Sequence, residues 1–441
     1  MSTKKDPKLF AIRRLEVSQI GPFAQLDMTF PDKPARDKAE IHILTGENGT
    51  GKSTVLQMLA NCVPNKSRLL RKKVWPHVVS NYKITFSNEV TATYQGMLIS
   101  APSEYARAYR KGKVDLLPNY FPEQFIWAYE DDKERFGFAL FAYSGYRKLS
   151  DSTVEAISDL KVSPFENALD FDKSTDTKTF VNWLANSIAR SALAMAKGRS
   201  EDRARAENYD LPIKQLEKVI SDITGQRIKF ELQEDPLAIL IHVDEQPLEF
   251  EQLPDGLKSI VSWLGDLIMR LDRIQWATSV PLTERNFILF LDEIEIHLHP
   301  AWQRKILPVV QQLFPNAQIF ISTHSPFVVG SVDGAWVHRF VKDAQGHSRL
   351  QGEPILSEDS NSYEYILSEI FGVTERFGVE VERDLQEFKT IKSQILRNEA
   401  NFNNAHFEQL VVKLMSQSTE IQSIIGMELR QLSRLTNRTF A

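Results

Sequence analysis

Nine consecutive residues constrain this chain more than any other segment: Gly46-Glu47-Asn48-Gly49-Thr50-Gly51-Lys52-Ser53-Thr54. They match the pattern G-x-x-x-x-G-K-[ST]. The apolar residues 41–44 precede the pattern and predict a buried strand, and residues 55–59 follow it and predict a helix. A glycine-rich loop between a strand and a helix is the setting that a phosphate-binding loop requires. The sequence therefore predicts an α/β protein that binds a nucleotide.

The chemistry of the loop assigns a role to each kind of residue in it. Glycine lets backbone N–H groups turn inward around phosphate oxygens, where a Cβ would clash, and the helix N-terminus favours negative charge. Lys52 is expected to reach the β- and γ-phosphates of ATP, and the Ser53 hydroxyl is expected to bind Mg²⁺. The candidate nucleotide-binding residues of the loop are Gly46, Asn48, Gly49, Thr50, Gly51, Lys52, Ser53 and Thr54.

Composition and charge limit the class of protein. A chain of 441 residues predicts two or three structural units. The net charge of −5 does not point to nucleic acid, and the local basic runs 66–73 and 107–113 are more typical of solvated surface. The single cysteine, Cys62, fits a reducing compartment and is predicted to be a core residue. Because no signal peptide or long apolar run is present, we expect a cytoplasmic protein without a membrane partner.

Two later segments predict the rest of an ATP site. The unbroken apolar run 287–291 is typical of a strand covered on both faces, and Asp292 and Glu293 follow it at the end where ligands bind in α/β sheets. We expect Asp292 to hold Mg²⁺ and Glu293 to orient or deprotonate the attacking water. His324 follows the next strand, 318–322, and is predicted to sense the γ-phosphate.

Other patterns predict how the remainder is organised. Residues 82–86 and 90–94 predict a β-hairpin, residues 138–143 a buried strand, and residues 257–274 a helix. The expected parts are an N-terminal lobe (1–99), a helical lid that contains strand 137–143 (100–225), a C-terminal lobe (226–345) and a helical tail for assembly or partner docking (346–441). From about residue 360 the tail is predicted to be wholly helical, with apolar stripes at 381–395 and 421–432.

Taken together, the phosphate loop, the Asp292-Glu293 strand, His297-Leu298-His299-Pro300 and Ser322-Thr323-His324-Ser325-Pro326 resemble the ABC-type ATPases of the SMC, RecF and OLD group. The resemblance covers roughly residues 8–340. It implies an α/β head in which a mixed antiparallel sheet joins a parallel RecA-like core, here with a short helical lid and a helical C-terminal tail. It also implies ATP and Mg²⁺ as cofactors.

The resemblance further implies a dimer in which two heads enclose two ATP molecules. A signature loop of one head then caps the γ-phosphate held by the other, and the matching segment here is 253–259 with Asp255 and Gly256 as candidate binding residues. Pro254 replaces the usual serine, which removes a hydroxyl and a backbone donor and leaves the rate of hydrolysis open. The glutamine that the family has before its lid is also missing, and residues 144–147 stand in its place.

The length and content of the segment between the phosphate loop and the signature loop distinguish among the members of this ATPase group. The interval between Thr54 and Leu253 lacks the long heptads of SMC proteins, and no nuclease signature is present, so we expect no nuclease activity of the chain's own. A short-lidded head with a helical tail is similar to the ATPase subunits of bacterial antiphage systems, either Septu and retron-associated ATPases or, alternatively, the PARIS ATPase. That similarity implies an ATP-hydrolysing sensor and scaffold that controls a separate nuclease effector of HNH or Toprim type, with DNA or a phage component as a further partner. The alternatives are a RecF- or SMC-like DNA-repair ATPase that acts directly on DNA, and a non-hydrolysing scaffold stabilised by ATP.

Overall fold

The computed structural model describes residues 9–61, 80–87, 89, 91–96, 136–145, 149, 152–154, 156–171, 173, 175–277, 279–358, 361–397 and 403–436. The chain divides into two compact units, Met1–Phe371 and Gly372–Ala441. The predictions for Cys62, for the basic runs 66–73 and 107–113, and for residues 100–135 of the lid lie outside the described residues.

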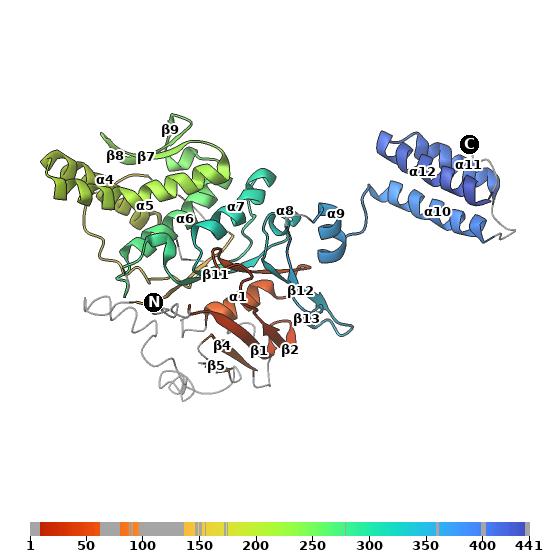
Figure 1. Ribbon diagram of the computed structural model, residues 1–441, viewed down its shortest axis with the longest axis horizontal. Coiled ribbons are helices and arrows are strands. Elements are labelled where there is room, and N and C mark those ends of the chain that lie inside the picture. Colours follow the sequence, from red (N-terminus) through yellow and green to blue (C-terminus); the bar gives the residue numbers. More distant parts are fainter. Residues whose placement is uncertain are drawn as a thin grey trace, which may run out of the picture. The chain divides into compact units, whose positions relative to one another are not determined.

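A mostly parallel sheet forms the centre of the first unit (Figure 1). Its strands, in spatial order, are β13 (Ser348–Leu350), β12 (Trp336–Lys342), β3 (Glu40–Gly46), β11 (Ala317–Ser322), β10 (Phe287–Leu291) and β6 (Ala139–Tyr143), and β14 (Ile355–Leu356) pairs with β12. The five strands from β12 to β6 are parallel to one another. Strand β11 therefore separates the strand before the phosphate loop from the strand before Asp292.

The apolar runs that predicted buried strands are covered on both faces. Along β10, Phe287, Leu289 and Leu291 pack into one apolar cluster. Ile288 and Phe290, which point the other way, pack into a second cluster. Successive side chains of a strand alternate between faces, so a run without polar residues is stable only between two apolar layers.

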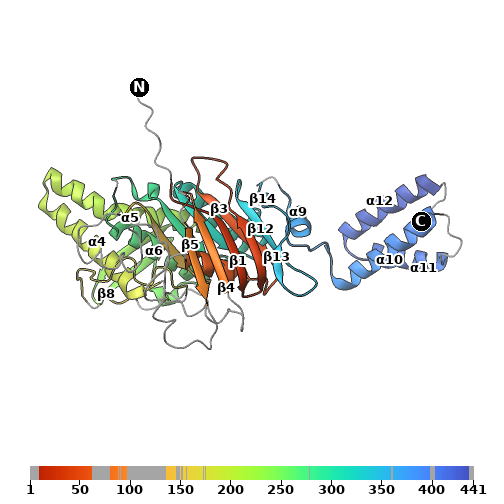
Figure 2. The same ribbon diagram turned by 90° about the horizontal axis from the view of Figure 1, so that it is seen from below.

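An antiparallel sheet and helix α1 (Lys52–Ala60) make up the layer on one face of the parallel sheet. The order of its strands is β2 (Phe23–Thr29), β1 (Ile12–Ile20), β4 (Ser80–Phe86) and β5 (Thr91–Gly96). The pairing of β4 with β5 confirms the predicted hairpin. Figure 2 shows these strands lying side by side. The predicted α/β class, an antiparallel sheet joined to a parallel core, is confirmed.

Helices cover the other face of the parallel sheet (Figures 1 and 2). The main ones are α4 (Thr177–Lys197), α5 (Ser200–Thr224), α6 (Asp255–Arg273) and α7 (Pro300–Leu313). A small antiparallel sheet, β7 (Ile228–Glu234), β8 (Leu237–Val243) and β9 (Gln246–Leu248), connects α5 to α6. Short helical turns complete the unit: Phe250–Gln252, Leu282–Glu284, α8 (Pro326–Val329), α9 (Tyr363–Tyr365) and the π-helical turn Ile366–Ile370. No helix among the described residues is long and apolar enough to cross a bilayer.

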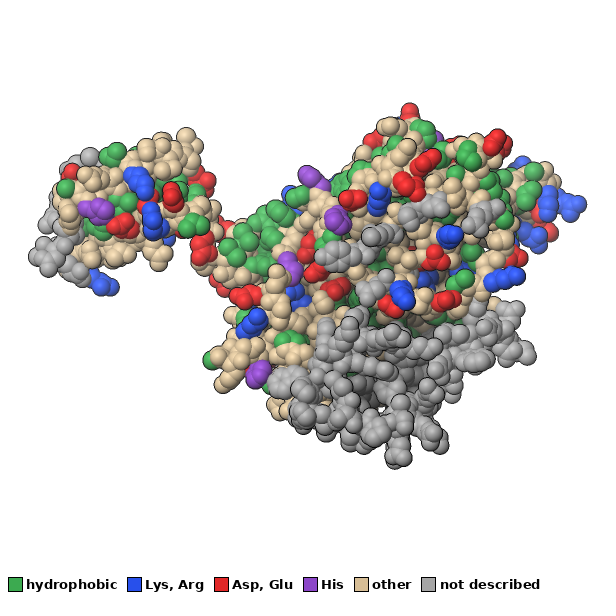
Figure 3. Space-filling model, turned by 180° about the vertical axis from the view of Figure 1, so that it is seen from behind, with side chains coloured by type: hydrophobic (Ala, Val, Ile, Leu, Met, Phe, Trp, Pro, Cys, Tyr) green, Lys and Arg blue, Asp and Glu red, His purple; other side chains and the backbone are tan. Residues whose placement is uncertain are grey.

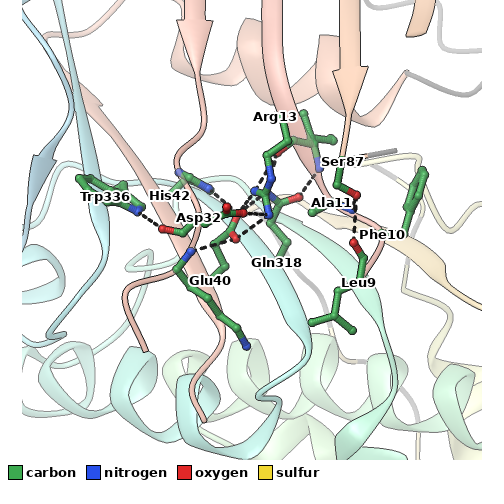
Figure 4. A network of polar contacts seen from close by, with 12 residues as sticks. Leu9, Phe10, Ala11, Arg13, Asp32, Glu40, His42, Ser87, Gln318 and Trp336 are labelled. Carbon is green, nitrogen blue, oxygen red and sulfur yellow. Dashed lines mark hydrogen bonds and ion pairs between the residues drawn. The ribbon is translucent and has the colours of Figure 1, made fainter. Parts of the chain in front are cut away.

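A buried polar network joins the antiparallel sheet to the parallel sheet (Figure 4). The Glu40 carboxylate at the start of β3 accepts hydrogen bonds from Arg13 of β1 at 2.6 Å and from Gln318 of β11 at 2.5 Å. His42 lies 2.9 Å from the same carboxylate and 3.2 Å from His338 of β12. These partners outweigh the cost of burying the charge, so the pKa of Glu40 falls to about 2. Burial lowers the pKa of His42 and of His338.

Replacing Glu40 by glutamine is expected to lower the free energy of unfolding at pH 7 by about 1.5–3 kcal/mol, because the variant loses charged hydrogen bonds in a buried site. The stabilisation by ionised Glu40 also depends on pH. Since the folded state lowers the pKa of Glu40 from 4.5 to about 2, the stabilisation is complete above pH 4.5 and is lost as the pH falls toward 2. Urea unfolding followed by circular dichroism at several pH values measures the difference.

Glu16→Gln on the same sheet is the matched control. Glu16 forms ion pairs with Arg14 and Lys83 at 3.5 and 3.8 Å, but its side chain is 38% exposed. Exposed pairs of this kind contribute about 0–1 kcal/mol. An equal loss in both variants, or a difference that does not shrink with acidification, would contradict a special role for the Glu40 network.

Residues 346–371, assigned to the tail from the sequence, belong instead to the first unit. The physical reason is pairing, because β13 and β14 extend the parallel sheet through antiparallel contacts with β12. The segment after residue 360 is also not wholly helical, since residues 372–377 have no helix. Regular helices resume at Val379.

The second unit is a bundle of three helices, α10 (Val379–Leu396), α11 (Asn404–Met415) and α12 (Thr419–Thr436). The two apolar stripes predicted from the sequence share one core. Leu385 and Phe388 of α10 pack with Ile425 and Leu432 of α12 in a cluster that α11 completes. Single helices of this length are marginal in water, so each stripe must be covered, and in this unit the three helices cover one another.

Candidate functional site

The phosphate loop connects β3 to α1, and its glycines lie where other residues would not fit. Gly46 and Gly51 have φ values of 141° and 95°. A Cβ on Gly46 would approach the Phe340 carbonyl oxygen to 2.3 Å, and one on Gly51 would lie 2.6 Å from Pro22. Gly49 is also left-handed, with φ 76°. The pattern therefore reflects backbone geometry, as a phosphate-binding loop requires.

The N-terminus of α1 remains available for an anion. No side chain caps it, and its first turn contains no acid. Thr50 closes the loop by donating its hydroxyl to the Glu47 carbonyl at 2.8 Å. Lys52 donates Nζ to the carbonyls of Gly46 and Glu47 at 2.9 and 3.0 Å. Thr54 is buried behind the loop, while Asn48 is exposed at its tip.

Ser53 and Asp292 meet although 239 residues separate them. The Ser53 hydroxyl donates to Asp292 Oδ1 at 3.0 Å. Ser322 of β11 donates to the same oxygen, and the Asp292 backbone N–H donates to the Tyr143 carbonyl at 2.9 Å. A hydroxyl and a carboxylate fit Mg²⁺ as it binds in nucleotide sites, with few protein oxygens and the phosphates completing the shell. The oxygen pair and the glycine-lined loop therefore fit Mg²⁺ and ATP.

Glu293 has a left-handed backbone, with φ 48°, which is uncommon for a residue with a side chain. Its N–H donates to Ser322 Oγ at 2.9 Å, and this contact stabilises the turn after β10. Burial, followed by the charge of Asp292, raises the pKa of Glu293, while Lys52 acts in the opposite direction. A raised pKa brings a carboxylate closer to the range in which a general base works.

His324 lies at the end of β11, in the field of Lys52 and Asp292. Burial and the charge of Lys52 lower the pKa of His324, which favours the neutral imidazole near pH 7. The His324 backbone N–H donates to Glu295 Oε1 at 2.6 Å. A neutral imidazole has one N–H that can donate to a phosphate oxygen.

Asp255 and Gly256 begin helix α6, directly after Pro254. Asp255 is exposed, whereas Gly256 is buried. A Cβ on Gly256 would lie 2.7 Å from the His297 carbonyl oxygen and 3.1 Å from the Trp302 ring. The structure thus places Gly256 beside the His297–Pro300 segment, and the phosphate loop is not among its nearest neighbours.

Three residues of the site were not assigned a role from the sequence. Ser322 links Asp292 to Glu293, and Glu295 holds the backbone of His324. Gly145, after β6, lies against Glu293. Ser322 opens the recognised segment Ser322–Pro326, so its position in the sequence was a signal, whereas Glu295 lies between two recognised motifs. Their partners became visible only once the strand order was known.

Gly145→Ala is expected to lower the rate of ATP hydrolysis while leaving ATP binding nearly unchanged. The added methyl would lie 2.9 Å from the Glu293 carbonyl oxygen and 2.6 Å from Ile296 Cδ1, so the Glu293 turn must move. A shift of about 1 Å at a reacting group costs on the order of 100-fold in rate. Steady-state ATPase kinetics and binding of a fluorescent ATP analogue measure the two effects.

Gly137→Ala is the control for this change. Gly137 precedes the same strand, and a Cβ there meets no atom within 4 Å. Equal hydrolysis by both variants would show that Gly145 does not constrain Glu293.

Comparison with known proteins identifies the family. The family model described as "AAA domain, putative AbiEii toxin, Type IV TA system" matches residues 102–330. A second model, described as an AAA domain, matches residues 10–63 and so includes the phosphate loop. Together the two matches cover both halves of the candidate ATP site.

Similar proteins include the Septu protein PtuA of Bacillus thuringiensis, which is 20% identical over 97% of this chain and 100% of that protein. The Retron Vc95 probable ATPase of Vibrio cholerae is 23% identical over 73% of this chain and 71% of that protein. The Retron Ec83 probable ATPase of Escherichia coli is 35% identical, but over only 23% of this chain and 19% of that protein. The predicted resemblance to Septu and retron-associated ATPases is confirmed.

Among solved structures, the SMC head domain from Thermotoga maritima covers 78% of this chain and 99% of its own, with 13% identity and a TM-score of 0.36. The SMC head bound to the C-winged helix domain of ScpA matches with 10% identity and a TM-score of 0.39, over 78% of this chain and 98% of its own. The family model over residues 102–330 spans more than half of the 441 residues, and the chain therefore belongs to the AAA-domain family that this model describes.

Proposed function

We propose that this protein is the ATP-binding and ATP-hydrolysing subunit of a bacterial antiviral defence complex, in which it senses infection and controls a separate nuclease. The observation that carries the ATPase part is the contact between Ser53 and Asp292, which joins the phosphate loop to the acidic turn after β10. The names of the similar proteins, Septu PtuA and two retron ATPases, support the defence part.

The proposed chemistry uses residues at the carboxyl ends of three adjacent strands. Lys52 and the N-terminus of α1 bind the phosphates, and Ser53 and Asp292 hold Mg²⁺. When bound, Mg²⁺ neutralises charge that develops on the phosphates. Glu293 accepts a proton from the attacking water, and neutral His324 donates a hydrogen bond toward the γ-phosphate. Catalysis of this type is mostly positioning and electrostatic stabilisation.

We further propose that the working form is an ATP-stabilised dimer or a higher assembly of dimers. Gly256 lies beside the His297–Pro300 segment on the first unit, and Asp255, which precedes it, is exposed. This placement supports the proposal that Gly256 and the His297–Pro300 segment form one surface, which contacts a second head in the dimer. Each ATP would then be shared by two heads, and its binding energy would stabilise the assembly by mass action.

One observation favours a second function, a scaffold that binds ATP without hydrolysing it. Pro254 occupies the N-cap of α6 and provides no side-chain hydrogen bond. Helix N-caps usually carry a hydroxyl or carboxylate oxygen. If this loop caps the γ-phosphate of a neighbouring head, Pro254 weakens the contact. Direct action on DNA has less support, because the net charge is −5. On the described part of the face drawn in Figure 3, Lys and Arg side chains are interspersed with Asp and Glu.

The test is to measure assembly and hydrolysis in the same preparation. We expect light scattering at micromolar protein to show a dimer or larger species with ATP and Mg²⁺. We also expect phosphate release that depends on both. Removal of the three-helix unit by truncation after Phe371 should leave ATP binding intact, because every candidate ATP residue lies before it.

The truncated protein also tests whether the tail serves in assembly or partner docking, as the sequence predicts. Reduced co-purification with an adjacently encoded nuclease, or loss of higher assembly, would support docking through the tail. A full-length protein that stays monomeric with ATP and Mg²⁺ would contradict the proposed dimer. ATP-dependent assembly without phosphate release would favour the scaffold.

A further inference from the structure

Three residues at and just after the end of β11 are tied to residues between the end of β10 and the first turn of α7. Ser322 Oγ donates to Asp292 and accepts from the Glu293 N–H. Ser325 Oγ donates to Gln303 Oε1 at 2.5 Å. Between them, the His324 N–H donates to Glu295 Oε1 at 2.6 Å. Ser322 and His324 are therefore held to residues 292–295 after β10, and Ser325 is held to helix α7.

We propose that Glu295 is a positioning residue for ATP hydrolysis, which holds the backbone of His324 in place relative to Lys52 and Glu293. This inference rests on the proposed ATPase function. It gives a role to an acid whose side chain accepts a hydrogen bond from the His324 backbone N–H. An imidazole can be placed only as accurately as its own backbone, and Glu295 is the side chain that binds that backbone.

The burial of Glu295 supports a dedicated contact. The Glu295 side chain is half-buried, and desolvation raises its pKa while the hydrogen bond from the His324 backbone N–H opposes the shift. An acid kept away from water is costly unless it is hydrogen-bonded. Glu295 also belongs to the group of acids, with Asp292 and Glu293, whose charges act on Lys52.

A backbone contact connects Glu295 to the surface proposed for the dimer, because the Leu298 N–H donates to the Glu295 carbonyl at 3.0 Å. Gln303, which accepts from Ser325, donates Nε2 to the Leu298 carbonyl at 2.8 Å. Leu298 lies in the His297–Pro300 segment, and the same segment contacts Gly256. A movement of that segment when two heads meet would therefore reach His324 through Glu295 and Gln303.

Two substitutions separate the hydrogen bond from the charge. Glu295→Gln keeps an oxygen that can accept the His324 N–H but removes the negative charge. Glu295→Ala removes both. If Glu295 positions His324, E295A should lower kcat by roughly 10- to 100-fold, the range for a lost hydrogen bond to a charged group, without changing KM. E295Q should keep most of the wild-type kcat. Equal loss in E295A and E295Q would overturn the proposal in favour of a purely electrostatic effect.

A double-mutant cycle with His324→Ala tests whether Glu295 acts through His324. Residues that act as one unit are not additive. We therefore expect E295A to cause little further loss of kcat in the H324A background. Additive losses would overturn the proposal. Glu284→Ala is the control, because Glu284 is an exposed acid that precedes β10.

Hydrogen exchange provides a readout that does not need activity. The His324 amide should exchange faster in E295A than in wild type and at close to the wild-type rate in E295Q, measured by mass spectrometry on peptides that span residues 319–326. Unchanged protection in E295A would overturn the proposal. If E295A does not fold, Glu295→Asp makes the same comparison, because its side chain is shorter by one methylene. A wild-type protein that releases no phosphate would refute the proposed function, while the exchange result still decides whether Glu295 holds His324.

Discussion

Lys52→Ala is expected to weaken ATP binding by roughly 100-fold while the protein stays folded. In the structure, Lys52 Nζ donates hydrogen bonds to the carbonyls of Gly46 and Glu47 in the phosphate loop. It is the one lysine of that loop, and its charge is the main side-chain counterpart of the β- and γ-phosphates. The remaining affinity should come from backbone N–H groups and the N-terminus of α1.

Isothermal titration with ATP and Mg²⁺, together with melting temperatures, makes the measurement. Lys83→Ala is the matched control, since Lys83 lies on β4 and pairs with Glu16 at 3.8 Å on an exposed surface. The control should bind ATP as the wild type does. If folded K52A keeps the wild-type affinity, nucleotide binding at this loop is refuted.

The parts of the site that could be predicted from the sequence depend on local geometry. Gly46 and Gly51 were recognised because their positive φ values and close contacts permit no other residue, which produces a readable pattern. Asp292 and His324 were recognised because residues at the carboxyl ends of parallel strands meet at one edge. The pairing of β3 with β11 and of β11 with β10 bears out that geometric premise.

The contacts that could not be predicted depend on the order of the strands in the sheets, which brings together residues far apart in the sequence. Ser322 acquires its contacts with Asp292 and Glu293 only because β11 lies between β3 and β10. The left-handed backbone of Glu293 has no local signal, since neither glycine nor asparagine stands there. The Glu40 network brings together residues from four strands, and no spacing in the sequence indicates their contact.

The tail illustrates the same limit. Periodicity correctly marked the apolar faces of α10 and α12, but a stripe does not show what covers it. The cover proved to be within the tail, with α11 completing the bundle. A partner would therefore have to bind the outer surface of the bundle, because the predicted stripes are already buried.

Glu293→Gln should reduce kcat by roughly 100- to 10,000-fold, the range that general-base catalysis contributes, while ATP stays bound. An amide oxygen can still accept a hydrogen bond from water, but an amide does not take up a proton at neutral pH. The backbone turn should persist in the variant, because the Glu293 N–H, rather than its side chain, donates to Ser322. Removing a negative charge beside Asp292 should also favour the phosphates. The variant is therefore expected to accumulate as an ATP-bound dimer.

Single-turnover hydrolysis and light scattering, with Glu284→Gln as the exposed control, distinguish the two proposed functions. An ATPase predicts that E293Q stops phosphate release and prolongs the assembled state, whereas E284Q behaves as the wild type. A scaffold that holds ATP without hydrolysing it predicts no phosphate release from any of the three proteins, since Glu293 would then have no proton to accept. Wild-type hydrolysis that persists in E293Q would exclude Glu293 as the base and would require another acceptor near the Ser53–Asp292 pair.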